Sequence, residues 1–311
     1  MIDAQEILRY LQEQNVDYET NFELLKNFEI YTFSPLKKPK DQSITWARDI
    51  DGVSSHLVMQ LNRLHHILII CNAPVRTDLQ CSAIYVDDPH KVYFKIISRF
   101  FVQQPAVPDI SEKAIVNTGI IGTGVGIGAF SYIDANVKIG NHVTIGCNVT
   151  ITGDVTIGDN TVIESGCVIG FCGFGFYKES DGTSIKIPHM GGVLIGHDCD
   201  IGANCTIARG TLSDTVIGNY VKIDAMCHVA HNVEIGDRVI MAGGAKIAGS
   251  TVVEEDVWIG GNVSVSNGLT IGKHSFIGIG SVVTKNILPY KAAFGVPARM
   301  LRENTPNVYT R

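Results

Sequence analysis

The sequence predicts a mainly β fold, in which a parallel β-helix of hexapeptide repeats follows a small N-terminal α/β domain. Aliphatic residues recur every six positions from Ile121 to Val283, and glycine often follows them, as in Ile139-Gly140. An α-helix turns every 3.6 residues, so a strict six-residue period would drift off its face within two turns. Short strands joined by corners satisfy this period, because each coil stacks its aliphatic residue on the coil below.

Residues 1–108 lack the repeat, and we expect a small α/β domain there. A one-sided apolar pattern predicts a first helix, and the turn signal Asp87-Asp88-Pro89 precedes a second one. Apolar runs between them predict strands. The expected helices cover residues 4–14 and 90–101, and the expected strands cover residues 67–70 and 83–86.

The β-helix domain is expected over residues 109–288, after a proline-containing junction at residues 103–108. The repeat is interrupted by a loop at residues 171–193 and by a short slip at residues 210–215, which we expect to be a bulged corner. A long loop that leaves a rigid rod often carries binding function, so we expect the first interruption to contribute to a site. Residues 289–311 are expected to form a C-terminal tail.

The composition narrows the class of protein. The chain has 311 residues, of which 45% are hydrophobic and 18% charged, with a net charge of −6. This acidic balance disfavours a general nucleic-acid-binding protein. The eight cysteines form no C-x-x-C pair, which indicates buried free thiols in a reducing cytoplasm. No apolar stretch reaches the length of about 18 residues that a transmembrane helix needs, so we expect a soluble cytoplasmic protein.

Four motifs stand out in and around the repeat. They are Gly173-Phe174-Gly175-Phe176, Lys186-Ile187-Pro188, Thr206-Ile207-Ala208-Arg209-Gly210 and His228-Val229-Ala230-His231-Asn232-Val233. Together with the repeat and the N-terminal domain, these motifs resemble the UDP-3-O-acylglucosamine N-acyltransferases of lipid A biosynthesis. The resemblance extends from residue 1 to about residue 280 and implies a left-handed β-helix and a homotrimer with active sites between neighbouring helices.

The resemblance implies two groups that act on the thioester. The catalytic histidine of the family falls on His231, and the backbone N–H that binds the oxyanion falls on Gly249. A neutral imidazole can accept the proton that the attacking amine loses. A backbone N–H can stabilise the charge that develops on the carbonyl oxygen. The two residues are one 18-residue coil apart, so we expect them on the same corner of adjacent coils.

Further residues are predicted to orient the base or to bind the acceptor substrate. Asp224, seven residues before His231, is a candidate for orienting the imidazole. Trp46 ends the segment Ser43-Ile44-Thr45-Trp46, which fits the family's uridine-binding domain, and it is expected to stack on a uracil ring. The other candidates are Phe174 and Phe176 in the loop, His189 for phosphate or sugar, His228 as a structural or substrate-lining residue, and Asn232 for sugar or acyl chain.

The C-terminal part departs from this family and bears on the acyl donor. Segments 280–285 and 295–299 look like acetyl-CoA-dependent sugar acetyltransferases, and the helices that dock acyl carrier protein are missing. Lys285 and Arg299 are therefore predicted to pair with coenzyme A phosphates. Ala208 replaces an acidic residue of the family, and Ser266–Leu269 lacks a downstream histidine that some members have.

The combined hypothesis is an N-acyltransferase acting on a UDP-linked amino sugar of lipopolysaccharide, lipid A or O-antigen. The donor is either a short acyl-CoA or a 3-hydroxyacyl chain on acyl carrier protein, with no permanent cofactor and no metal. One alternative is a zinc enzyme like the γ-class carbonic anhydrases, which needs three converging histidines, whereas only His228 and His231 are close in sequence. Another is a scaffold without catalytic activity.

Overall fold

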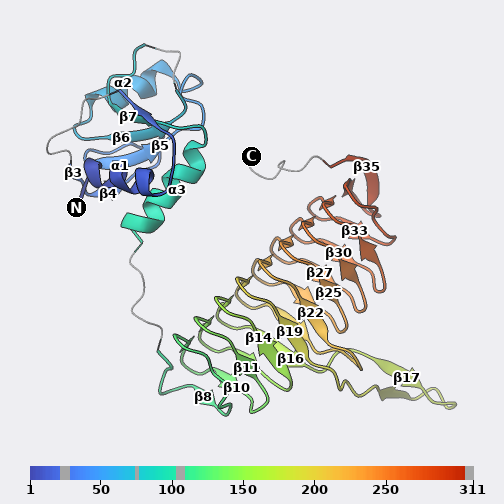
Figure 1. The fold of residues 1–311 in the computed structure, drawn as a ribbon. Coiled ribbons are helices and arrows are strands. Elements are labelled where there is room, and N and C mark those ends of the chain that lie inside the picture. The colour runs from blue at the N-terminus through green and yellow to red at the C-terminus, as the bar shows by residue number, and fades with distance from the viewer. Residues whose placement is uncertain (22–28, 74–76, 103–108, 305–311) are drawn as a thin grey trace. The chain divides into compact units, whose positions relative to one another are not determined.

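The computed structural model describes residues 1–21, 29–73, 77–102 and 109–304 (Figure 1). The chain divides into two compact units, Met1–Pro105 and Ala106–Arg311. The boundary falls within the junction predicted at residues 103–108, whose own conformation lies outside the described residues.

The N-terminal unit is built on a mixed sheet with the strand order β2-β7-β6-β5-β4, in which β2 is antiparallel to β7 and the other neighbours are parallel. Strands β1 and β3 form a separate two-stranded antiparallel sheet. The strands are β1 (Ile2–Asp3), β2 (Glu19–Thr20), β3 (Glu29–Ile30), β4 (Thr32–Phe33), β5 (Ser43–Trp46), β6 (Leu68–Cys71) and β7 (Ser82–Tyr85).

Capping residues define the starts of the helices in this unit. Asp3 and Glu6 form a capping box at α1 (Ala4–Glu13), and Asp88 caps α3 (Pro89–Phe100), which begins with a proline that needs no N–H partner. Helices α1 and α3 and strands β6 and β7 match the two predicted helices and the two predicted strands within one or two residues. A further helix, α2 (Ser55–Arg63), was not predicted from the sequence.

Residues 109–304 wind through parallel sheets that we number 1 to 3. Sheet 1 has the order β33-β30-β27-β24-β21-β16-β13-β10-β8 and carries most of the residues discussed below. Its strands are β8 (Ile115–Val116), β10 (Tyr132–Ile133), β13 (Thr150–Ile151), β16 (Val168–Phe171), β21 (Thr206–Ala208), β24 (His228–Val229), β27 (Lys246–Ile247), β30 (Ser264–Val265) and β33 (Val282–Val283).

Sheets 2 and 3 complete each coil, because the chain passes from sheet 1 to sheet 2 to sheet 3 and back. Sheet 2 contains β11 (Lys138–Ile139), β14 (Val155–Ile157), β19 (Val193–Ile195), β22 (Thr215–Ile217), β25 (Glu234–Ile235), β28 (Val252–Val253) and β31 (Thr270–Ile271). Sheet 3 contains β9 (Gly126–Ile127), β12 (Thr144–Ile145), β15 (Val162–Ile163), β20 (Asp200–Ile201), β23 (Lys222–Ile223), β26 (Ile240–Met241), β29 (Trp258–Ile259), β32 (Phe276–Ile277), β34 (Lys291–Phe294) and β35 (Arg299–Glu303).

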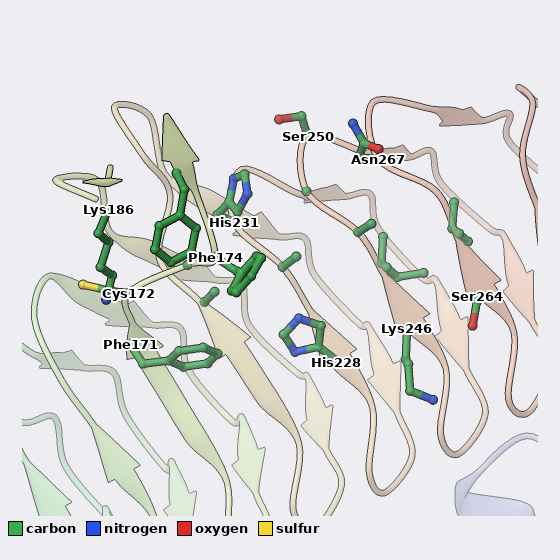
Figure 2. Close-up of a pocket in the computed structure, with 18 residues that line it drawn as sticks. Phe171, Cys172, Phe174, Lys186, His228, His231, Lys246, Ser250, Ser264 and Asn267 are labelled. Atoms are coloured by element: carbon green, nitrogen blue, oxygen red, sulfur yellow. The ribbon is translucent and has the colours of Figure 1, made fainter. Parts of the chain in front are cut away.

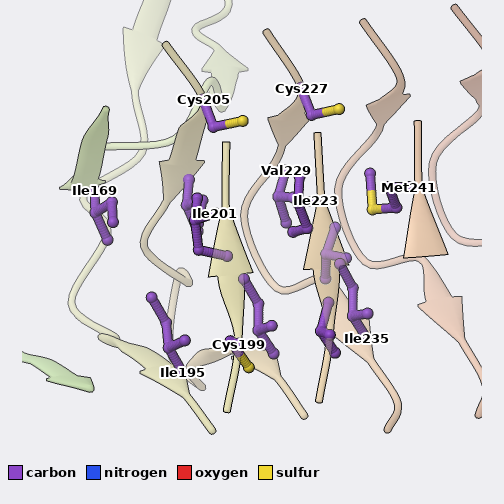
Figure 3. Close-up of a cluster of buried hydrophobic side chains, with 14 of the residues drawn as sticks. Ile169, Ile195, Cys199, Ile201, Cys205, Ile223, Cys227, Val229, Ile235 and Met241 are labelled. Carbon is purple, nitrogen blue, oxygen red and sulfur yellow. The ribbon is translucent and has the colours of Figure 1, made fainter. Parts of the chain in front are cut away.

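The register of the strands explains the six-residue period. In regular coils a residue pairs with the residue 18 positions later, as Tyr132 does with Thr150. From Ile127 onward the apolar residue of each hexad is buried, so the interior is a set of stacked columns made mostly of Ile and Val (Figure 3). Removing apolar surface from water contributes about 25 cal/mol of free energy per Å², so these columns are a large source of stability for the β-helix.

Two insertions change this register. Val168 pairs with Thr206, because a hairpin of β17 (Phe176–Lys178) and β18 (Ser184–Lys186) leaves the coil between them (Figure 1). Thr206 in turn pairs with His228, because the slip at residues 210–215 adds residues to one corner. The loop predicted at residues 171–193 is thus a β-hairpin with its two connections to the coil.

The segment expected as a C-terminal tail continues the β-helix. Strand β34 pairs in parallel with β32 in sheet 3, and β35 returns antiparallel to β34. This arrangement covers the last coil with paired backbone as far as Glu303.

All eight cysteines are free thiols, and six of them are buried. Cys199, Cys205 and Cys227 lie among the aliphatic side chains of the core (Figure 3). The exposed thiols are Cys147 and Cys172. Within the described ranges, every helix is too short or too polar to cross a bilayer.

Candidate active site

A cavity of about 770 Å³ lies between sheet 1 and the base of the hairpin (Figure 2). The hairpin and its connections contribute Phe174 and Lys186. The coil side contributes Phe171, His231 and Gly249 among other residues. The second predicted aromatic residue of the loop, Phe176, also lines the cavity, with its ring centroid 5.0 Å from that of Phe174. The predicted loop and the predicted catalytic pair therefore meet at one site.

His231 lies on the corner that joins sheet 1 to sheet 2, directly after β24. Its Nδ1 is 3.1 Å from Oδ1 of Asn232. This Oδ1 also accepts hydrogen bonds from the backbone N–H and the hydroxyl of Thr211, while Nδ2 of Asn232 donates to the backbone oxygen of Ser213. The amide oxygen can only accept, so Nδ1 of His231 carries the proton and Nε2 is left with a free lone pair.

Gly249 lies on the same corner of the next coil. Ser250 N–H donates to the backbone oxygen of His231 over 3.0 Å, which ties the two coils together at this point. A Cβ built on Gly249 would lie 2.7 Å from Cε1 and 2.8 Å from Nε2 of His231, so only glycine leaves room for the imidazole. Among the hydrogen bonds of the described residues, none uses the Gly249 amide as donor. The proximity that the repeat spacing predicted is confirmed.

The prediction that Asp224 orients His231 is wrong for this chain. Asp224 lies on the corner between sheets 3 and 1, one corner before His231. Its carboxylate accepts hydrogen bonds from Ala225 N–H at 2.7 Å and Gly243 N–H at 3.0 Å. A separation of seven residues exceeds a hexad and carries the chain to the next corner, so Asn232 takes the orienting position instead.

The side chain of Asn232, which we predicted to bind sugar or acyl chain, makes its contacts within the protein in this structure. Both ends of its side-chain amide are occupied by Thr211, Ser213 and His231. Its backbone has a φ of 58°, in the left-handed region that asparagine tolerates better than most residues. Asn232 thus fastens the slip at residues 210–215 to the corner that carries His231.

His228 lines the cavity, as one of its two predicted roles requires (Figure 2). Its Nδ1 is 2.7 Å from the hydroxyl of Thr206 on the preceding coil. Burial, with the positive charge of Lys246 as a smaller cause, lowers the pKa of His228 below its ordinary value. The lowered pKa favours the neutral form of this ring.

His189 is not among the residues that line the cavity, and its contact with phosphate or sugar stays a prediction. It is buried, with 4% of its surface exposed, and it is absent from the cavity lining. Its ring instead packs edge-on against that of His231, with the centroids 5.1 Å apart. The hairpin folds this residue back onto the catalytic corner, which the sequence pattern alone did not reveal.

Several residues of the site were not predicted. Lys246 and Ser264 follow His228 in the register of sheet 1 and line the same cavity, as does Lys186 from the hairpin. The 18-residue period applied to His228 would have found Lys246 and Ser264. Arg209 fixes the base of the hairpin, because its Nε donates to the backbone oxygen of Gly170 over 2.7 Å.

The remaining predicted residues lie away from this cavity. In the N-terminal unit, Trp46 packs against His90 and Phe94 with ring centroids 4.9 and 6.4 Å apart. Lys285 and Arg299 are exposed near the C-terminal end of the β-helix. Their roles in binding uracil and coenzyme A stay predictions.

The lining residues give the cavity a positive charge. Lys186 and Lys246 contribute two cations, and the described residues around the cavity include no carboxylate, although the chain has a net charge of −6. Throughout the described part of the chain, no three histidine, cysteine or acidic side chains are grouped to hold a metal ion.

The sequence matches the family described as bacterial transferase hexapeptide (six repeats), over residues 118–153, 136–170 and 214–249. A UDP-3-O-acylglucosamine N-acyltransferase of Coxiella burnetii (strain RSA 493 / Nine Mile phase I) is 58% identical over 87 residues, 28% of this chain and 25% of that protein. A protein of the same name from Methylorubrum extorquens (strain PA1) is 43% identical over 137 residues, 44% of this chain and 39% of that protein. The chain thus spans a quarter to two fifths of the length of these relatives.

Solved structures extend the similarity along the β-helix. A crystal structure of a UDP-N-acetylglucosamine acyltransferase shares 30% identity with a TM-score of 0.56, covering 62% of this chain and 73% of that one. LpxA from Acinetobacter baumannii shares 26% identity with a TM-score of 0.57, covering 62% of this chain and 74% of that one. These matches confirm the left-handed parallel β-helix, and the chain is a member of the hexapeptide-repeat acyltransferases.

Proposed function

We propose that the protein transfers an acyl group from a thioester to the amine of a UDP-linked amino sugar, with His231 as general base. The observation that carries the proposal is the pairing of His231 and Gly249, which join one cavity from adjacent coils. The curated relatives named above act, by their names, on UDP-3-O-acylglucosamine. Because this chain matches only 25% and 39% of the length of these relatives, the substrate is part of the proposal.

The proton balance follows from the hydrogen bonds of the base. The amine attacks the thioester carbonyl as the free base, so an N–C bond forms and the C–S bond breaks. Nε2 of His231 accepts the proton that the nitrogen loses and then gives it to the departing thiolate. Asn232 Oδ1 keeps the proton on Nδ1 throughout, which leaves Nε2 as the reacting nitrogen. General-base catalysis of this kind contributes about 10²–10⁴ in rate.

The backbone amide of Gly249 supplies the second requirement of the reaction. The carbonyl oxygen gains negative charge as the nitrogen attacks, and an unengaged N–H at this corner can donate to it. One such donor is worth about 3 kcal/mol of transition-state stabilisation. Because Gly249 has no side chain, the acyl carbon can approach both this amide and the imidazole.

The charge of the cavity supports an anionic acceptor such as a nucleotide sugar. Lys186 and Lys246 attract a phosphate group, and no carboxylate among the lining residues opposes them. His228 is held neutral by its lowered pKa, so it can exchange hydrogen bonds with a sugar hydroxyl without adding charge. Trp46 is proposed to stack on the uracil ring.

The donor is proposed to be an acyl thioester of coenzyme A or of acyl carrier protein, and no permanently bound cofactor takes part. One wall of the cavity is apolar, since Ala208, Ala230 and Ala248 follow one another on successive coils and suit an acyl chain. Lys285 and Arg299 are proposed to contact coenzyme A phosphates. We further propose a cytoplasmic homotrimer, in which a neighbouring subunit completes each site.

The direct test is thiol release from defined donors. The purified chain is incubated with acyl-CoA of increasing chain length, or with 3-hydroxyacyl carrier protein, in the presence of UDP-glucosamine or UDP-3-O-acylglucosamine. Thiol formed above the background of the exposed Cys147 and Cys172 is measured, and the product is weighed by mass spectrometry. We expect acceptor-dependent thiol release with at least one pair. No release with any pair contradicts the proposed function, and the donor that works decides between coenzyme A and carrier protein.

A further inference from the structure

His189 is a buried polar residue that the proposed mechanism does not use. It follows the hairpin strand β18, and only 4% of its surface is exposed. Its ring meets that of His231 at an interplanar angle of 71°, with the centroids 5.1 Å apart. The imidazole of His189, which follows the hairpin, therefore packs against the imidazole of His231 on the coil.

The hydrogen bonds of His189 determine its protonation. Nδ1 lies 2.9 Å from the backbone oxygen of Ile187. A carbonyl oxygen only accepts, so Nδ1 carries the hydrogen and Nε2 has a lone pair. Among the described residues this buried Nε2 has no hydrogen-bond partner. Buried polar atoms are almost always paired, and an unpaired one costs free energy, so its retention requires a reason.

Gly173 keeps the two imidazoles together. A Cβ built on Gly173 would lie 2.6 Å from Nε2 of His189 and 2.8 Å from Cβ of His231. Any other residue at this position would push the hairpin away from the base. Nε2 of His189 and Cβ of His231 therefore both lie close to the same point beside Gly173, and this Nε2 is buried.

We propose that His189 is a positioning residue for the transfer reaction. It supports the ring of His231 edge-on, and its unpaired Nε2 stabilises the positive charge that His231 acquires on accepting the proton of the amine. His189 gives up and takes no proton itself. A fixed lone pair in a dry site acts strongly on a charge that appears only during the reaction, because no water must reorganise around it. This inference rests on the proposed function.

Two substitutions separate this role from simple packing. His189→Phe keeps a ring of similar size against His231 but removes the lone pair. His189→Gln removes the ring but retains an N–H for Ile187 and an oxygen lone pair in place of Nε2. A packing role predicts that the phenylalanine variant is the more active of the two, whereas the proposed role predicts the reverse.

The experiment compares kcat and KM of both variants with the wild-type chain by thiol release, with circular dichroism as a check of folding. We expect His189→Phe to lower kcat about tenfold with little change in KM, and His189→Gln to stay within about threefold of wild type. A kcat of His189→Phe that equals or exceeds the kcat of His189→Gln overturns the inference while the proposed function stands. Absence of turnover in the wild-type chain defeats the proposed function, and the role of His189 in the reaction with it.

A measurement on the unmodified chain needs neither variant nor substrate. Long-range ¹H–¹⁵N spectra distinguish the two neutral tautomers of a histidine. We expect His189 to carry its hydrogen on Nδ1 and to show a bare Nε2. A spectrum with the hydrogen on Nε2 removes the lone pair on which the inference depends, even if the variants fail to fold.

Discussion

Nδ1 of His231 lies 3.1 Å from Oδ1 of Asn232, and this contact determines which nitrogen of the imidazole is free. The amide of Asn232 cannot turn over, because Thr211 donates to its oxygen and Ser213 accepts from its nitrogen. The bulged corner at residues 210–215 thus sets the tautomer of the proposed catalytic base. A neutral amide contacts the imidazole at the position where the sequence predicts the carboxylate of Asp224.

Asn232→Ala is expected to lower kcat by about tenfold or more, because His231 loses the acceptor that keeps the hydrogen on Nδ1. The substitution also places alanine at a positive φ, so strain must be separated from the loss of the acceptor. Asn160→Ala is the matched control, since Asn160 occupies a corner with a φ of 57° and is not among the residues that line the cavity. Equal losses of kcat in the two variants would show that Asn232 acts only through the backbone.

Gly249→Ala is expected to reduce turnover by about 10² or more while the β-helix stays folded. The added methyl group would lie within 2.8 Å of two imidazole atoms, so the ring of His231 must turn away. Gly261→Ala is the control, because a Cβ there meets its nearest atom at 3.4 Å. Turnover of Gly249→Ala at the level of the control would mean that this corner does not approach the reacting groups.

The lowered pKa of His228 predicts a pH dependence of stability. The folded state binds a proton on this ring less readily than the unfolded chain, whose value is 6.5. The free energy of unfolding therefore falls as the pH drops below 6.5 toward the lower folded-state value, and it is fully retained above 6.5. His228→Gln should flatten this part of the curve, as measured by urea denaturation between pH 8 and about pH 5.

Acidic groups with lowered pKa values affect stability at a lower pH than His228, so they do not interfere with the comparison of wild type and His228→Gln. The pKa of Asp256 lies below its ordinary value of 3.8, first because Arg238 hydrogen-bonds to it. Its stabilisation is fully present above 3.8 and is lost only as the pH falls further. Identical curves for wild type and His228→Gln between pH 5 and 6.5 would contradict the burial of a neutral His228.

Lys246→Met is expected to raise KM for the nucleotide sugar about five- to tenfold with a small effect on kcat, because it removes a cation that lines the cavity and that we propose attracts the phosphate. Lys222→Met is the matched control: Lys222 holds the same place in its hexad but lies in sheet 3, where it pairs with Asp200. A change in KM of equal size in both variants would reduce the effect to the overall charge of the protein.

The repeat period predicted most of the β-helix and the meeting of His231 with Gly249, because a fixed register converts distance in sequence into position in space. It failed for Asp224, because a separation of about one hexad moves a side chain to the next corner and only a separation of 18 residues returns it to the same corner. The helix α2 was missed because its short apolar pattern buries only Val58 and Leu61.

The six-residue period does not predict which residues of the hairpin segment contact the coil. His189 meets His231 only because an antiparallel pair returns the chain to the coil from which it left. The contacts of Asn232 depend in the same way on the conformation of an irregular corner. Where the repeat is interrupted, tertiary packing rather than hexad position decides which side chains meet.

The most direct measurement is the turnover of His231→Ala beside His197→Ala. His197 has the same place in its hexad, and its Nδ1 likewise contacts the following residue, Asp198, at 2.7 Å, but it does not line the cavity. We predict that thiol release falls by at least about 10² in His231→Ala and is unchanged in His197→Ala, with both proteins folded. Turnover of His231→Ala at the wild-type rate would contradict the account.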